Sequence, residues 1–262
     1  MQEQNKNQAP RQGHYIDTLH NQDKVLKESI SLFIGGSLEF LDTQISGKVT
    51  DILSTEITET TTKKAYADNA LKLDTNEGLH IEGEVHISKD DMVRFASYNL
   101  DLAQQHKIDF TTVIITTNKP SVKGYKSRSI SFTPIIINLK ERDADEVLAE
   151  VDRRLQVGED IGISELHLIY LPLYGSKSGK TTAELLDKAI KLTPLVAKDN
   201  VARQRKLHSL IILLTGTFVS NDEMNRVLEA NMINMETNSA VVVLEKMGAK
   251  RRESEIACKH AS

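Results

Sequence analysis

The chain has 262 residues, of which 39% are hydrophobic and 27% are charged, so it can bury a core without disulfide bonds, as one large domain or one domain with an appendage. Its single cysteine, Cys258, has no partner for an internal bridge, nothing resembles a signal peptide, and no apolar run approaches the roughly 18–20 residues that span a bilayer, so we expect a cytoplasmic protein with no membrane partner. The net charge of −4 does not indicate a nucleic-acid-binding protein, although a count over the whole chain does not exclude a local basic patch.

The N-terminal region divides into a polar segment and a predicted helix. Residues 1–20 are rich in Gln, Asn and Lys, have no hydrophobic periodicity and are expected to be disordered. From residue 22 to about residue 40, apolar side chains recur at helical spacing, and Gly35 and Gly36 weaken or kink the predicted helix near its middle. Residues 49–62 then indicate a weak strand and a loop.

Residues 80–87 alternate strictly between polar and apolar side chains. A period of two predicts a strand that buries its apolar set and carries its polar set on the other face. That polar face gathers two imidazoles and two carboxylates, all able to bind metal: His80, Glu82, Glu84 and His86. The competing interpretation is an ordinary solvent-facing strand of an antiparallel sheet.

A preceding strand-like run and a cluster of turn formers around Asn76 predict a β-hairpin. With the turn centred there, Asp68 lies opposite Glu84 and diagonal to Glu82 or His86. Three carboxylates then converge within about 5–8 Å, which is costly unless a cation neutralises them. All-oxygen ligation suits Mg²⁺ or Mn²⁺ better than zinc, and a register slip of one residue would scatter the group.

The following elements predict a mixed sheet. Residues 90–105 have the pattern of an amphipathic helix, and residues 110–117 form a β-branched run typical of a strand buried on both faces. Strand, helix and strand in this order predict an α/β sheet with a helical crossover. Residues 129–139 predict another strand, in which Pro134 favours an edge or a bulge, and a helix capped by Asp143 follows.

Between the last two strands, residues 118–128 form a loop whose cations surround Tyr125. The four cations are Lys119, Lys123, Lys126 and Arg128. Spaced cations beside an aromatic ring are suited to contact a phosphate backbone. A solvated basic hairpin tip is an equally supported interpretation.

Residues 166–174 predict a strand that runs into a glycine-rich loop, Gly175 to Thr182. A strand followed by Gly-Lys-Thr at a helix start is the context of a phosphate-binding P-loop. The motif requires four residues between its glycines, and here only three separate Gly175 from Gly179. A helix N-cap after a turn therefore explains this segment better, with a P-loop-like domain as the alternative fold. From Thr182 onward the apolar pattern is helical.

Several of these motifs together resemble a known family. Tyr66-Ala-Asp68, a hairpin, and then His80-Ile-Glu82-Gly-Glu84 resemble the metal-binding core of the PD-(D/E)XK nuclease superfamily. Residues 91–98, in which one residue and not two separates Met92 from Arg94, resemble the Met-x-x-Arg-x-x-x-Tyr helix of its recombination-promoting nuclease or putative transposase branch, and residues 23–27 resemble that branch's opening Asp-Lys-x-x-Lys. The similarity covers roughly residues 21–170.

The resemblance implies a function and a set of site residues. It implies a metal-dependent DNA endonuclease linked to recombination or mobile elements, with Mg²⁺ or Mn²⁺ as cofactor and DNA as partner. Asp68, Glu82 and Glu84 are the implied catalytic residues, and the metal ligands are Asp68, Glu82 and the carbonyl of Gly83. His86 is a further helper. Glu28, in the first helix, is another, although a solvent-facing acid is favoured there.

The pattern departs from the superfamily at one position, since Glu84 stands where Lys, or Gln in this branch, is usual. The alternative function is therefore a catalytically silent DNA-binding or interaction protein that retains the nuclease fold. The predicted organisation is a disordered segment (1–20), a restriction-endonuclease-like α/β core with a mixed sheet flanked by helices (21–170), and a helical C-terminal extension (171–262). A homodimer is the association that we allow for.

Overall fold

The computed structural model describes most of the chain between residues 26 and 233. The described residues are 26, 29–34, 38–41, 45, 47–57, 65–66, 69–159, 162–198, 200–216, 218–231 and 233. Several of the sequence-based expectations fall outside them: the disordered segment 1–20, Glu28, the helix-weakening Gly35 and Gly36, Asp68 and Cys258.

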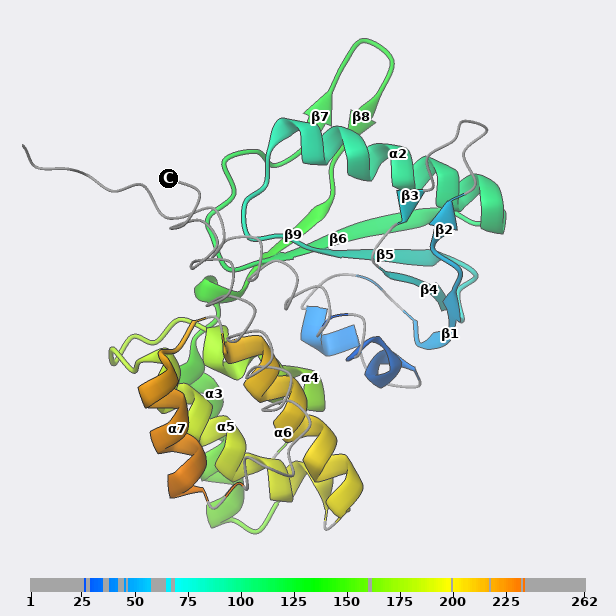
Figure 1. Ribbon diagram of the computed structural model, residues 1–262. Helices are drawn as coiled ribbons and strands as arrows, with labels where there is room; N and C mark the ends of the chain where they lie inside the picture. The colour runs from blue at the N-terminus through cyan, green and yellow to red at the C-terminus, as the bar shows by residue number, and fades with distance from the viewer. Residues whose placement is uncertain are drawn as a thin grey trace, which may run out of the picture.

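A five-stranded mixed sheet forms the centre of the protein, in the order β1-β4-β5-β6-β9 (Figure 1). Its strands are β1 (Val49–Leu53), β4 (Asn69–Leu73), β5 (Gly78–Gly83), β6 (Phe110–Thr116) and β9 (Ile135–Asn138). Strand β4 pairs antiparallel with both β1 and β5, whereas β6 pairs parallel with both β5 and β9. The predicted α/β class with a mixed sheet is therefore confirmed. Pro134 directly precedes β9, which is an edge strand as its proline indicated.

The predicted hairpin of β4 and β5 is present, but its register differs from the expected one. Ala70 pairs with His80 and Lys72 with Gly78, whereas a turn placed to set Asp68 opposite Glu84 would pair Ala70 with Glu82. The strands are thus shifted by two residues, which keeps each side chain on its expected face. The turn is tight because Asn76 adopts a left-handed conformation (φ 65°), which Asn tolerates better than most residues.

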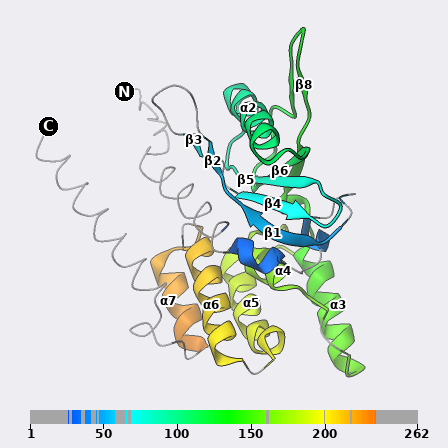
Figure 2. The same cartoon turned by 90° about the vertical axis from the view of Figure 1, so that its right-hand side faces the viewer.

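Helix α2 (Lys89–His106) connects β5 to β6 and covers one face of the sheet (Figures 1 and 2). It begins at Ser88, whose hydroxyl accepts from the Asp91 backbone N–H while the Asp91 carboxylate accepts from the Ser88 N–H, a complete capping box. Its inner side buries Met92 and Phe95. The predicted crossover helix is therefore confirmed.

The opposite face of the sheet packs against short 3₁₀ helices and a helical region. The helical elements are η1 (Ile30–Phe33), η2 (Leu38–Leu41), η3 (Leu139–Glu141), α3 (Ala144–Gln156), α4 (Glu165–Tyr170), η4 (Leu171–Leu173), α5 (Thr182–Ala197), α6 (Val201–Thr215) and α7 (Asn221–Ala230). One continuous hydrophobic core joins sheet residues such as Ile81 and Val113 to helical residues such as Leu186 and Ile211. Within the described part of the chain, no helix combines the length and apolarity needed to cross a membrane.

The strand predicted over residues 166–174 is wrong, since this segment forms α4 and η4. An uninterrupted apolar run suits either a buried strand or a buried helix, so periodicity does not separate the two. Ser164 decides between them, because its hydroxyl accepts from the His167 backbone N–H and starts a helix.

The P-loop alternative is also wrong. No strand precedes the loop, and the loop's polar groups bind the start of α3 instead of leaving a cradle for phosphate. Lys180 forms a short ion pair with Asp145, whose carboxylate also accepts from the backbone N–H and the hydroxyl of Ser178, each at 2.8 Å. Gly175 forms a parallel β-bridge beside Asp143: its N–H donates to the Arg142 carbonyl, and its carbonyl accepts from the Ala144 N–H. The segment therefore connects the start of α3 to the start of α5 by hydrogen bonds and an ion pair.

Candidate active site

Two carboxylates lie together where β5 ends. Glu82 and Glu84 point to the face of the sheet that α2 covers. Glu82 is therefore only 4% exposed, and the side chain of Glu84 is only 13% exposed. The interpretation of this polar face as an open, solvent-facing surface is wrong. Both faces of β5 are covered, one by α2 and the other by the core that it shares with the helical region. Buried acids are rare unless they are paired, and they are frequent at functional sites.

His80 is the partner of Glu82. Its Nε2 lies 2.6 Å from the Glu82 Oε1, and the imidazole is fully buried with its ring against the edges of Phe95 and Tyr98, at centroid distances of 6.4 and 6.3 Å. A histidine in this position orients a carboxylate and does not face an open metal site.

Glu84 forms an ion pair with Arg94 of α2. One Arg94 N–H donates to the Glu84 Oε1 at 2.5 Å, and the same guanidinium nitrogen lies 3.2 Å from Asp91. The guanidinium also lies over the Phe95 ring, 4.8 Å from its centroid. Arg94 is the arginine of the Arg-x-x-x-Tyr pattern in residues 91–98, but that pattern does not indicate a contact with Glu84; its place ten residues after Glu84, at the start of a predicted helix that folds back on the strand, is a usable signal.

Burial and charge affect the two members of this pair differently. Burial raises the pKa of Glu84 from 4.5 to about 7, and Arg94 offsets this only in part because Asp91 and Glu82 add negative charge. Burial lowers the pKa of Arg94, but the surrounding carboxylates raise it by more, so Arg94 remains charged. Burial is thus the main cause of the raised pKa of Glu84, and the negative charge of Asp91 and Glu82 adds to it.

The raised pKa of Glu84 predicts a pH-dependent stability in the metal-free protein. The folded-state pKa of Glu84 is raised, so the folded state holds the proton more tightly and stability falls as pH rises from 4.5 through 7. Glu84→Gln removes this loss, and its free energy of unfolding relative to wild type should rise by about 1–2 kcal/mol between pH 5 and pH 8. Urea unfolding in chelator measures it. Glu77→Gln, in the exposed turn, is the matched control; an equal difference at both pH values would contradict the prediction.

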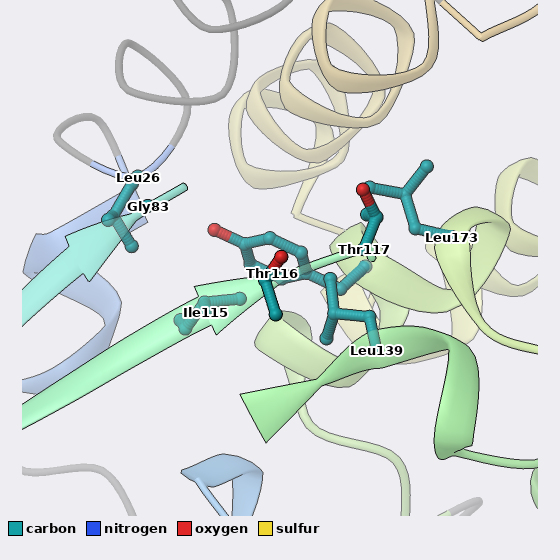
Figure 3. Close-up of a pocket in the computed structure, with 8 residues that line it drawn as sticks. Leu26, Gly83, Ile115, Thr116, Thr117, Leu139 and Leu173 are labelled. Atoms are coloured by element: carbon teal, nitrogen blue, oxygen red, sulfur yellow. The ribbon is translucent and has the colours of Figure 1, made fainter. Parts of the chain in front are cut away.

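Gly83 separates the two acids and faces the other side of the sheet. Figure 3 shows it beside Leu26, Thr116 and Leu139 at a small cavity. The cavity volume is about 10 Å³, which holds one water molecule at most and is far too small for an organic ligand. A Cβ at Gly83 would meet Leu26 Cδ2 at 3.5 Å, an ordinary contact, so packing among the described residues does not require glycine there.

The remaining predicted metal-site residues are placed as follows. His86 is exposed in the connection between β5 and α2. Asp68 and Glu28 lie outside the described residues, so their predicted roles stay predictions. Among the residues that the structure describes, no group of three or more His, Cys, Asp or Glu side chains is arranged to hold a metal. The described donors are Glu82, Glu84 and the backbone between them.

The four predicted DNA-binding cations lie on or beside a projecting hairpin, β7 (Tyr125–Lys126) with β8 (Ser131–Phe132), which extends past α2 in Figures 1 and 2. All four are exposed, and none forms an ion pair with another described residue: Lys119, Lys123, Lys126 and Arg128. We call residues 118–134 the basic arm.

The base of the basic arm touches the connection that follows the two acids. The Asn118 side-chain amide donates to the Val85 carbonyl at 3.0 Å, and the Ser121 hydroxyl donates to the Ile87 carbonyl at 3.3 Å. These bonds bring the arm, more than thirty residues downstream, to the end of the strand that carries Glu82 and Glu84.

Comparisons with known proteins add little. No protein-family model and no curated protein matches the sequence. Two solved structures of the Acinetobacter baumannii Cap4 SAVED/CARF-domain containing receptor, one of them with the cyclic trinucleotide 3'3'3'-cAAA, are weakly similar, with 12% and 11% identity and TM-scores of 0.24 and 0.23. The matches cover 86% of this chain but 48% and 46% of the receptor chains, so it spans about half their length. TM-scores this low carry no conclusion about fold or function.

Proposed function

We propose that the protein is a metal-dependent DNA endonuclease with a PD-(D/E)XK-type core. The observation that carries the proposal is the pair of buried carboxylates, Glu82 and Glu84, at the end of a central strand, with a cation from the crossover helix beside them. The resemblance of the motif around Glu82 to the superfamily core supports the proposal, and from the same resemblance we propose a role in recombination or mobile elements.

The donor set fits a hard divalent cation. Carboxylate and carbonyl oxygens are the ligands that Mg²⁺ and Mn²⁺ prefer, and Mg²⁺ sites at phosphates commonly use only one or two protein carboxylates. The ligands would be Glu82, Asp68 and the carbonyl of Gly83. The negative charge around Glu84 is what a bound cation would offset.

Each residue then has a defined task in phosphodiester hydrolysis. A divalent ion held by Glu82 and Asp68 would lower the pKa of a bound water and shield the charge that develops on the phosphate. Glu84 accepts a proton from the attacking water or adds a ligand, with His86 a lesser helper. Arg94 supplies positive charge beside the reacting phosphate and so offsets charge as a lysine at position 84 would.

A plasmid-nicking assay tests the proposal. Purified protein should convert supercoiled DNA to open circles in Mg²⁺ or Mn²⁺ and not in chelator. Calorimetry should detect binding of Mn²⁺ to the wild type. If the protein neither binds Mn²⁺ nor nicks DNA, the endonuclease proposal is wrong.

The second candidate function is a catalytically silent DNA-binding protein. One observation favours it: Glu84 is held by Arg94, so neither group stands open to a substrate in this structure. This candidate predicts DNA binding through the basic arm with no metal-dependent nicking.

The basic arm gives a prediction shared by both candidates. Lys123→Ala combined with Lys126→Ala should weaken binding to all DNA sequences and reduce the slope of log affinity against log salt by nearly one unit for each lost phosphate contact. Fluorescence anisotropy over a salt series measures the slope. The control, Lys188→Ala with Arg205→Ala, removes the same charge from exposed positions on α5 and α6. Equal slopes for the two double variants would mean that the arm is merely a solvated tip.

A further inference from the structure

A chain of buried hydrogen bonds leads from α2 through β6 and β5 to Glu82. Asn99 of α2 contacts Thr112 of β6, Thr112 contacts His80 of β5, and His80 contacts Glu82. We propose that this chain is a positioning relay, in which His80 holds Glu82 in the orientation required to bind a divalent cation. The inference rests on the proposed function and deepens it.

The direction of the relay is fixed at its start. The side-chain nitrogen of Asn99 lies 2.8 Å from the Phe110 carbonyl oxygen, which only accepts, so the amide orientation is set. The same nitrogen lies 3.0 Å from the Thr112 hydroxyl oxygen and donates its second hydrogen there. Thr112 is thereby left with its own hydrogen to donate onward.

Thr112 passes this direction to His80. Its hydroxyl lies 3.2 Å from the imidazole Nδ1, and donating to it makes Nδ1 the acceptor and places the proton on Nε2. Nε2 then donates to the Glu82 Oε1 at 2.6 Å. The tautomer that donates to the carboxylate is therefore selected by two residues that do not touch it.

The sheet and the helix together build the relay. His80 is the register partner of Thr112 in the parallel pairing of β5 with β6, so the backbone itself places the hydroxyl beside the ring. Tyr98 lies one residue before Asn99 on α2, and Phe95 lies four residues before it. Both pack their rings against the imidazole. A turn or shift of the imidazole would break its contacts with the Phe95 and Tyr98 rings.

The burial of the relay explains its effect. His80, Thr112 and Glu82 are all less than 5% exposed, so a carboxylate without a hydrogen-bond donor is strongly disfavoured here. A fixed donor on one oxygen settles the rotamer of Glu82 before any metal arrives. Outer partners of this kind typically change metal affinity by about 10–100-fold when they are removed.

Calorimetric titration with Mn²⁺ tests the relay without relying on activity. His80→Leu removes the donor at similar volume and should weaken Mn²⁺ binding about tenfold or more. His80→Gln places an amide N–H where Nε2 lies and should restore most of the affinity. Thr112→Val, which keeps the shape but frees the tautomer, should weaken binding by a smaller factor. Thr117→Val, another buried threonine beyond the end of β6, is the control and should leave the affinity unchanged.

The outcomes separate the relay from a packing effect and from the proposed function. If His80→Gln binds Mn²⁺ as weakly as His80→Leu, the ring acts through packing and the relay is wrong. If Thr112→Val binds as tightly as wild type, the tautomer argument is wrong. Both comparisons require a wild-type protein that binds Mn²⁺. If the wild type does not bind Mn²⁺, the proposed function is wrong, and the relay is wrong with it.

Discussion

Glu82→Gln should abolish metal-dependent nicking of plasmid DNA, with a loss of at least about 100-fold in rate. Glutamine has the shape of glutamate, and its carbonyl oxygen can still accept from His80, so the buried hydrogen bond survives. The negative charge that would hold the cation does not survive. The loss should therefore be one of metal binding and chemistry, with the fold unchanged by circular dichroism and thermal melting.

The chain offers a matched control at the other end of the same hairpin. Glu77 lies in the exposed turn before β5, and Glu77→Gln makes the same chemical change without touching the site. Its nicking rate should equal that of wild type. Asp68→Asn should behave like Glu82→Gln, because the family pattern gives both the same task. Undiminished nicking by Glu82→Gln would remove the metal site from β5.

Much of the fold was predictable from the sequence because local pattern and tertiary structure agree. The β-branched run of β6, the amphipathic pattern of α2 with its cap at Ser88, and the turn residues around Asn76 each determine an element almost alone. The class of the sheet followed from their order. The register of the hairpin did not, because a turn of several permissive residues accepts two pairings that leave every side chain on the same face.

The pairing of Glu82 and Glu84 on one face of a strand was predictable from the sequence, but the surroundings of the pair were not. The alternation around Glu82 looks like a half-exposed strand, yet its polar side is buried because His80 satisfies the carboxylate and α2 closes over both. Periodicity records which side chains share a face, but it does not record what covers that face. The same limit explains α4, where an apolar run was assigned to a strand although a serine cap makes it a helix.

The contact of Arg94 with Glu84 was not predictable for a related reason. Its importance depends on a contact between a strand end and the first turns of the next helix, and neither segment shows that contact in its own pattern. The contact also changes how the unusual acid at position 84 is best tested. Glu84→Lys alone restores the superfamily's usual residue, but it places an ammonium group against the guanidinium of Arg94.

A double-mutant cycle on Glu84 and Arg94 therefore gives the sharpest prediction. Glu84→Lys should lower the free energy of unfolding by about 1–2 kcal/mol, a modest value because the Arg94 side chain is 43% exposed and water screens the repulsion. It should also depress nicking, since two cations beside Glu82 oppose metal binding. Arg94→Gln alone should depress nicking because the site then has no cation to contact the phosphate.

Combined, the two changes should compensate each other. Glu84→Lys with Arg94→Gln leaves a single cation beside Glu82, as in the superfamily pattern, so both stability and nicking should exceed those of Glu84→Lys alone. Urea unfolding and nicking rates of the four proteins measure the coupling. If the double variant is no better than the product of the two single losses, Arg94 does not replace the missing lysine. Its ion pair with Glu84 would then be structural, and the catalytically silent protein would become the favoured function.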